Sequence, residues 1–222
     1  IILDYMTDLI HIMYGKDGCY GVVSQPKATR NGINSYLEGY LKEENIRFRD
    51  KKISFRDHAD SSKSGGLLAN WNDMDVEIGD FKLKVNKGLI NKNEVIGILG
   101  ENGIGKTSFV KLLKDEVKLK VAYKPQYLEG HSEELVGSVI AREQNEYKGQ
   151  ILKSLELNGL MDRKIKELSG GELQRLSIAL TLMKDSELIL MDEPSAFLDV
   201  EQRLNSSRII NEIVRLRGIS AF

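Results

Sequence analysis

The chain has 222 residues, of which 41% are hydrophobic and 29% charged, a composition typical of a globular protein with one large domain or two smaller ones. The 32 Lys and Arg residues nearly balance the 33 Asp and Glu residues, so the overall charge does not indicate a polyanionic partner. The single cysteine, Cys19, excludes an internal disulfide or a thiolate metal site, and no apolar run reaches the roughly 20 residues of a membrane span. We therefore expect a cytoplasmic protein.

The first 70 residues mix short elements with loops. Residues 1–15 predict a short helix that leads into the strand IHIMY, and the stretch from Arg30 to Tyr40 has the apolar spacing of a helix. The Ser- and Gly-rich stretch at 58–70, HADSSKSGGLLAN, predicts a linker or a long loop. We expect a domain boundary near it.

From residue 71 onward the pattern alternates between strands and helices. Two short alternating stretches, MDVEI and DFKLKV, precede the apolar run VIGIL, which leads into a glycine-rich loop and a helix over about 105–114. Further strands are predicted in VAYKPQ and ELILMD, and helices in ELQRLSIALTLMK and VEQRLNSSRIINEIVRLR, with a helical arm at about 127–168. This order predicts an α/β domain with a mostly parallel sheet, helices on both faces and an antiparallel flank.

The glycine-rich loop, GENGIGKT at residues 100–107, matches G-x-x-x-x-G-K-[ST] at every fixed position. Its glycines can adopt backbone angles closed to other residues and leave amides that wrap phosphate oxygens, to which the following helix adds its positive end. We expect Lys106 to bridge the outer phosphates and Thr107 to hold Mg²⁺. The predicted ATP or ADP site comprises Gly100, Glu101, Asn102, Gly103, Ile104, Gly105, Lys106, Thr107 and Ser108.

A second set of chemical groups follows the strand ELILMD. Asp192 and Glu193 stand at the strand's carboxyl end, where Pro194 prevents the ladder from continuing. Carboxylates at this edge of a parallel sheet face the ligand crevice. We expect Asp192 to bind Mg²⁺ directly or through its shell, and Glu193 to activate or orient the attacking water.

Gln126 closes the strand VAYKPQ, directly after Pro125. A neutral amide at this point can contact both the metal and the water. A glutamine here is equally compatible with an ordinary surface residue, and the neighbouring motifs favour the catalytic interpretation.

LSGGELQR at 168–175 is a second glycine-rich helix start, although the chain already has a phosphate loop. GENGIGKT, Gln126, LSGGELQR, LMDEP and SAFLD occur in the order and spacing of ABC-type ATPase domains, over roughly residues 70–217. GINSYLEGYLKEENIRFRD, YKPQ, LSGGELQR and DEPSAFLDVEQR further resemble the ribosome-recycling ABC ATPases, the RNase L inhibitor family, over essentially the whole chain.

This resemblance implies a domain organisation. Family members join two ABC domains by a hinge, so residues 1–15 would be the tail of a preceding ABC domain, 16–70 hinge and linker, and 71–222 an ABC domain that stops before the family's histidine switch. The resemblance also implies an Mg²⁺-dependent ATPase that needs its partner domain, so that this chain alone is inactive. ATP-driven closure and reopening of the two domains would split ribosomes in translation.

The resemblance also implies a role for the second glycine-rich helix start, LSGGELQR. In such proteins the signature of one domain closes over the nucleotide held by the other, so Ser169, Gly170, Gly171 and Glu172, with Asp199 of SAFLD, would serve the partner domain's nucleotide.

Two further binding residues or stretches follow from the same likeness. Trp71 would stack on adenine, with a core or hinge tryptophan as the alternative. The basic stretch 46–56 would contact ribosomal RNA, with a solvated strand face as the alternative. The implied partners are the other ABC domain, ribosomal subunits and translation termination factors, with no membrane.

Two other classes remain open. The cytoplasmic ATPase subunit of an ABC membrane transporter shares every nucleotide motif but lacks the GINSYLEGY to RFRD hinge. The other class is a non-catalytic scaffold or a chromosome-type ABC protein. The chromosome-type proteins need long heptad arms between Gln126 and Ser169, which the 42 intervening residues cannot supply.

Overall fold

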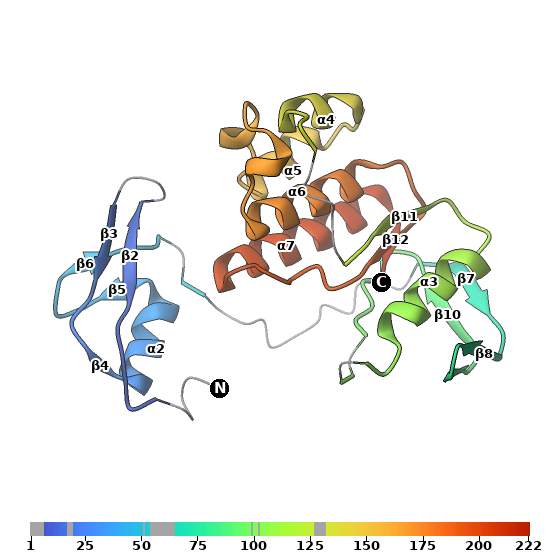
Figure 1. The fold of residues 1–222 in the computed structure, drawn as a ribbon, viewed down its shortest axis with the longest axis horizontal. Helices are drawn as coiled ribbons and strands as arrows, with labels where there is room; N and C mark the ends of the chain where they lie inside the picture. Colours follow the sequence, from blue (N-terminus) through green and yellow to red (C-terminus); the bar gives the residue numbers. More distant parts are fainter. Residues whose placement is uncertain are drawn as a thin grey trace. The chain divides into compact units, whose positions relative to one another are not determined.

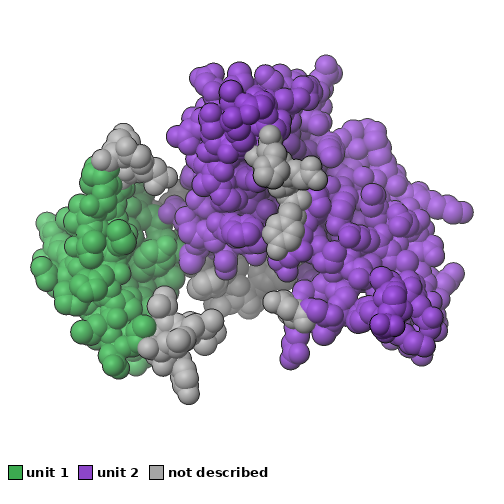
Figure 2. Space-filling view, in the orientation of Figure 1, with its two compact units in different colours: residues 1–60 green, residues 61–222 purple. Residues whose placement is uncertain are grey.

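The chain divides into two compact units, Ile1–Asp60 and Ser61–Phe222 (Figure 2). The division lies within the stretch 58–70 that the sequence indicates as a linker. The computed structural model of the chain describes residues 7–16, 20–50, 52–53, 65–98, 100–101, 103–126 and 132–222.

The described residues of the first unit form short antiparallel pairs of strands and one helix. The strand β1 (Leu9–Ile10) pairs with β4 (Lys27–Ala28), and β2 (Met13–Lys16) pairs with β3 (Tyr20–Val23). The helix α2 (Thr29–Glu38) follows, and then β5 (Tyr40–Leu41) pairs with β6 (Ile46–Arg47). Gly39 ends α2 in the left-handed conformation, with φ +72°.

The strand expected over residues 10–14 is wrong in its bounds. Two separate strands, β1 and β2, occupy this region, because Ile12 donates its amide hydrogen to the Ser24 hydroxyl at 2.8 Å rather than to a strand. The helix expected before them falls mostly on residues 1–6, outside the described residues, and Leu9 and Ile10, which follow, are extended.

The second unit is built on a parallel sheet in the order β11-β12-β13, formed by β11 (Val121–Lys124), β12 (Leu188–Met191) and β13 (Ser220–Ala221). The prediction of a strand in the run VIGIL is wrong for its described residues, 95–98. They are linked to this sheet by a parallel bridge from Val95 to Ala221 and by the bond from the Ile96 amide to the Ala221 carbonyl at 2.9 Å.

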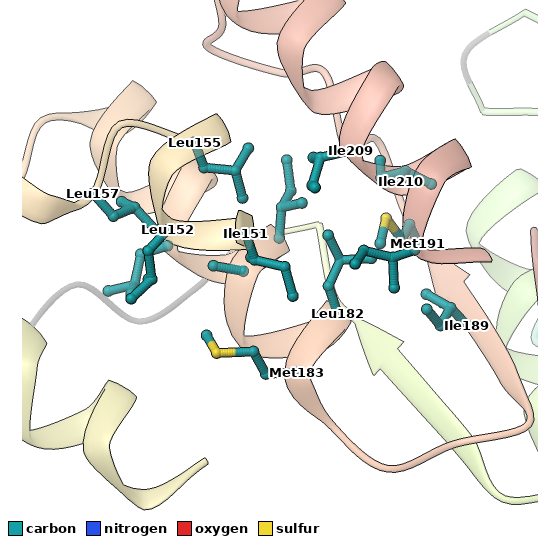
Figure 3. Packing of buried hydrophobic residues seen from close by; sticks show 14 of the residues in the cluster. Ile151, Leu152, Leu155, Leu157, Leu182, Met183, Ile189, Met191, Ile209 and Ile210 are labelled. Carbon is teal, nitrogen blue, oxygen red and sulfur yellow. The ribbon is translucent and has the colours of Figure 1, made fainter. Parts of the chain in front are cut away.

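The two faces of the sheet carry different helices (Figure 1). Leu188 and Leu190 of β12 pack with α3 (Lys106–Glu116), and the alternate residues Ile189 and Met191 pack on the other side. There they meet α6 (Gly170–Met183) and α7 (Val200–Arg217), as Figure 3 shows. The alternation confirms the predicted strand with helices on both faces.

The antiparallel flank comprises two pairs of strands. β7 (Leu67–Trp71) pairs with β10 (Gly88–Asn91), and β8 (Met74–Ile78) pairs with β9 (Phe81–Val85). The β8–β9 hairpin agrees with the predicted MDVEI and DFKLKV strands. It interrupts β7 and β10 in the chain, which hides their pairing from local patterns.

The helical arm contains α4 (Val136–Arg142), α5 (Lys148–Ser154) and short 3-10 turns at Asn158–Leu160 and Ile165–Glu167. Its apolar side chains share one core with α6. Arg175 of α6 ties the two together, because its Nη1 donates to the Leu155 carbonyl at 2.9 Å. Within the described ranges, no helix combines the length and apolar character needed to cross a bilayer.

Candidate functional site

The phosphate loop has the backbone that its sequence predicts. Gly103 and Gly105 have φ values of +84° and +99°, in the left-handed region that favours glycine. A Cβ atom on Gly105 would also lie 2.9 Å from the Phe81 ring, so the position lacks room for a side chain. Asn102, a predicted binding residue, lies outside the described residues.

Lys106 begins α3 and folds back over the loop. Its Nζ donates to the carbonyl oxygens of Gly100 and Glu101, both at 2.8 Å. The N-cap residue of α3 is Gly105, which offers no side-chain acceptor to the first turn, where Thr107 and Ser108 lie. The amides and the helix dipole at this end therefore suit a phosphate group.

Asp192 lies directly after β12 and is only 4% exposed. Its backbone amide donates to the Lys124 carbonyl at 3.0 Å, while its Oδ2 is buried and has no hydrogen-bond partner within the described part of the chain. A buried carboxylate oxygen left unsatisfied is unusual and is a suitable ligand for a hard cation. The donor set at this edge thus fits Mg²⁺.

Gln126 and Glu193, predicted separately from two strands, lie in contact. The Gln126 Nε2 donates to the Glu193 Oε2 at 2.9 Å. Glu193 has φ +46°, a left-handed conformation that costs energy for a residue other than glycine and is concentrated at functional sites. The structure therefore places a carboxylate and an amide together at the end of adjacent strands.

Lys124 is a site residue that the sequence interpretation missed. It is 0% exposed, and its Nζ donates to the carbonyl oxygens of Pro125 at 3.0 Å and Asp192 at 3.3 Å. Burial lowers its pKa to about 8, against the opposing attraction of the Asp192 and Glu193 carboxylates. The available signal was strand alternation, since Lys124 shares the buried face of β11 with Ala122.

The segment LSGGELQR, called the signature below, begins α6 with a complete capping box. Ser169 Oγ accepts from the Glu172 amide at 3.3 Å, and Glu172 Oε2 accepts from the Ser169 amide at 2.7 Å. Arg163 forms an ion pair with Glu172 at 3.2 Å. Burial raises the pKa of Glu172, but the bonds from Ser169 and the charge of Arg163 outweigh it, so the pKa is lowered overall.

The helix α6 also contacts the residues that follow β12 within this chain. Gln174, 6% exposed, donates from Nε2 to the Glu193 carbonyl at 2.8 Å. Sequence reasoning missed this bond, because the residues lie on separate motifs and no spacing rule connects them.

Asp199 is the N-cap of α7, and its Oδ1 accepts from the Gln202 amide at 2.8 Å. The preceding SAFLD turn carries the exposed Phe197, which has φ +60°. This turn lies against the start of α6, since a Cβ atom on Gly170 would be 3.5 Å from the Phe197 ring. The predicted LSGGELQR and SAFLD segments are therefore neighbours.

Trp71 lies in β7 and packs partly against the core beneath α3. Its Nε1 donates to the Asn86 carbonyl at 2.9 Å. The indole meets Phe109 and Phe222 edge-on, with ring centroids 6.0 and 6.5 Å apart. These contacts favour the alternative interpretation of a core tryptophan, and adenine stacking stays a prediction.

In the basic stretch, Arg49 is buried. Its guanidinium donates to the Tyr36 carbonyl and lies 5.1 Å from the Tyr36 ring centroid. Arg47 and Lys52 are exposed, whereas Lys51 and residues 54–56 lie outside the described residues.

Comparison with known proteins identifies the family. A family model described as "ABC transporter" matches residues 83–196, half of the chain. ABC transporter E family member 3 of Arabidopsis thaliana is 36% identical over 67% of this chain and 94% of its own. The chain belongs to the E family of ABC proteins.

Other likenesses cover nearly the whole chain. An uncharacterized ABC transporter ATP-binding protein of Methanocaldococcus jannaschii is 50% identical over 96% of this chain and 38% of its own length. The archaeal ribosome recycling factor aABCE1, solved in complex with the ribosomal stalk protein aP1, superposes with a TM-score of 0.86. It is 45% identical, over 99% of this chain and 46% of its own.

These likenesses confirm the predicted family and fold class, a P-loop ABC ATPase domain, and the domain is one that binds nucleotide. This chain spans less than half the length of each of these two proteins.

Proposed function

We propose that this chain contributes one ATP-binding half of a twin-ABC ATPase that splits ribosomes for recycling in the cytoplasm. Residues 71–222 are the ABC domain, 16–70 hinge and linker, and 1–15 the tail of a preceding ABC domain. The observation that most supports hydrolysis is the Gln126–Glu193 contact of 2.9 Å beside the buried Asp192.

In this proposal the loop residues hold ATP or ADP. The amides of Gly100 to Gly105 and the first turn of α3 surround the phosphates, and Lys106 exchanges its bonds to the Gly100 and Glu101 carbonyls for the outer phosphate oxygens. Thr107, Gln126 and Asp192 supply oxygen ligands to Mg²⁺, which offsets phosphate charge when bound.

Glu193 is the catalytic carboxylate, and Gln126 orients it. A carboxylate that directs water and accepts its proton accelerates reactions by about 10² to 10⁴. The left-handed backbone at Glu193, with φ +46°, carries strain of the kind that is concentrated at functional sites.

The signature acts on the partner's nucleotide. Ser169, Gly170 and Gly171, with Glu172 and Asp199, would close over ATP held by the other ABC domain. The closed capping box supports this assignment, because the first-turn amide of Glu172 already has an acceptor within the chain. Hydrolysis consequently requires both domains, and this chain alone is inactive.

The ribosomal partners are proposed from the aABCE1 likeness, and they include both subunits and translation termination factors. An RNA contact through 46–56 would use the exposed Arg47 and Lys52 rather than Arg49, whose guanidinium is bonded internally.

The test is sedimentation of the full-length protein with ribosomal subunits, with and without a nonhydrolysable ATP analogue. We expect nucleotide-dependent co-sedimentation, which Lys106→Ala should abolish. Absence of co-sedimentation, together with copurification of a membrane permease, would instead support a transporter subunit.

A further inference from the structure

Lys124 occupies an unusual position for a lysine. Its side chain is fully buried at the end of β11, although lysine rarely lies inside a protein without a compensating arrangement. Its Nζ has two acceptors, the carbonyl oxygens of Pro125 and Asp192, at 3.0 and 3.3 Å. Both are backbone groups, so the ammonium joins two segments of main chain.

Those two carbonyls immediately precede the two groups assigned to hydrolysis. The Pro125 carbonyl shares a rigid peptide plane with the amide of Gln126, and the Asp192 carbonyl shares one with the amide of Glu193. Fixing both oxygens therefore fixes the planes from which these two side chains emerge. The Gln126 Nε2 and Glu193 Oε2 atoms lie 2.9 Å apart on that foundation.

The Asp192–Glu193 segment needs such support. Glu193 has φ +46°, and a strained residue keeps its conformation only where the surroundings hold it. The Lys124 ammonium donates to the carbonyl of the preceding residue, Asp192, and Gln174 donates to the carbonyl of Glu193 at 2.8 Å. The Lys124 backbone adds a third constraint, because its carbonyl accepts from the Asp192 amide at 3.0 Å.

We infer that Lys124 is a positioning residue for ATP hydrolysis. Its ammonium links the peptide that precedes Gln126 to the peptide that precedes Glu193, and so sets the distance between the two side chains. The inference rests on the proposed ATPase activity. Lys124 acts through Gln126 and Glu193, because its Nζ is bonded to the carbonyl that directly precedes each of them.

The first test is Lys124→Met, which keeps the length of the side chain and removes the ammonium, in the full-length protein. We expect kcat to fall roughly tenfold or more, since small misplacements of reacting groups have large effects on rate. ATP affinity should change by less than about twofold, because the phosphate loop is untouched.

The matched control is Lys148→Met. Lys148 also joins two backbone carbonyls, those of Ile140 and Glu143 at 2.7 and 3.1 Å, but in the helical arm. Its loss should leave kcat within about twofold of the parent. A fall in kcat equal to that of Lys124→Met, or a parallel loss of ATP affinity and thermal stability in Lys124→Met, would assign Lys124 a general structural role.

A double-mutant cycle with Glu193→Gln separates positioning from any independent effect. If Lys124 acts through Glu193, the double variant hydrolyses ATP no more slowly than Glu193→Gln alone. Multiplicative losses would overturn the inference. Absence of turnover in the unmodified full-length protein would instead refute the proposed function, so the two failures are distinguishable.

Should Lys124→Met fail to fold, Lys124→Gln supplies the same measurement, because its amide can still donate to one carbonyl. Its kcat should lie between those of Lys124→Met and the parent. An unchanged kcat in a folded Lys124→Gln protein, with the charge gone and at most one bond kept, would contradict the inference.

Discussion

The N-termini of α3 and α6 are both glycine-rich, yet they are capped differently. At α3 the N-cap is Gly105, with φ +99° and no side-chain cap. At α6 the N-cap is Ser169, in an extended conformation with a complete capping box. Two similar glycine-rich sequences thus produce one helix N-terminus without a side-chain cap, at α3, and one with a side-chain cap, at α6.

In the proposed function, this difference would separate two kinds of phosphate recognition. A helix start with no side-chain acceptor, wrapped by left-handed glycines, has its amides directed to a ligand held by the same loop. A capped start is organised before any ligand arrives and presents a preformed surface. This is the arrangement expected of a motif that meets a nucleotide carried by another domain.

Lys106→Ala should have the largest effect on the α3 side. The charge that neutralises the outer phosphates is lost, so ATP affinity should fall roughly 100-fold, about 2.7 kcal/mol. Isothermal titration calorimetry of the chain measures it, with Lys111→Ala, exposed on the same helix, as the control. Equal affinities in the two variants would remove the functional distinction between the two helix starts.

Ser169→Arg tests the α6 side. The bulky cation fills the space that domain approach requires, so turnover of the full-length protein should fall about tenfold or more, while ATP affinity of this chain alone stays unchanged. Ser169→Asn, which preserves an N-cap acceptor, is the control. A large affinity loss in the isolated chain would show that the signature completes a site of its own chain.

Glu172→Gln sharpens the capping argument through pH. Because the folded pKa of Glu172 is lowered, its carboxylate contributes stability above its unfolded pKa of about 4.3, and that stability is lost as pH falls through the folded pKa. Urea unfolding should show the variant about 0.3 to 1 kcal/mol less stable at pH 7, and the difference should disappear once the pH is below the folded pKa of Glu172.

The control for this pH series is Glu212→Gln, exposed on α7. It should show no such convergence. A Glu172→Gln deficit that persists at low pH would mean that side-chain shape, rather than charge, closes the box.

The smallest expected effect is a change in the fluorescence of Trp71, which packs near α3, when ATP binds. Stacking on adenine would shift its fluorescence as ATP is added, whereas a role only in packing against Phe109 and Phe222 would leave its emission unchanged. The measurement is emission on ATP titration, with Lys106→Ala as a non-binding control. No shift, with normal affinity in Trp71→Ala, would establish the core interpretation.

The elements that the sequence predicts well are those with strong local signals. α3, α6, α7, β11 and β12 agree with their apolar patterns, and the phosphate loop agrees because glycine spacing encodes its backbone directly. The sequence also placed Gln126 and Glu193 at the ends of parallel strands, where such ends meet at one edge, but it did not predict the contact between their side chains.

What could not be predicted depends on distant contacts. The pairing of β7 with β10 spans an inserted hairpin, and the bond from Gln174 to Glu193 joins two motifs. Lys124 was missed because composition alone assigns lysine to the surface, although burial here is decided by two carbonyl acceptors.

The bridge between Val95 and Ala221 has a consequence for the order of folding. The segment that leads into the phosphate loop is held to the sheet by the Ala221 amide and carbonyl, which bond to Glu94 and Ile96 at 2.9 Å. Contacts between residues so far apart in sequence form late, because the whole intervening loop must close first. On a growing polypeptide, therefore, the segment that leads into the phosphate loop is synthesised well before β13, the strand that secures it to the sheet.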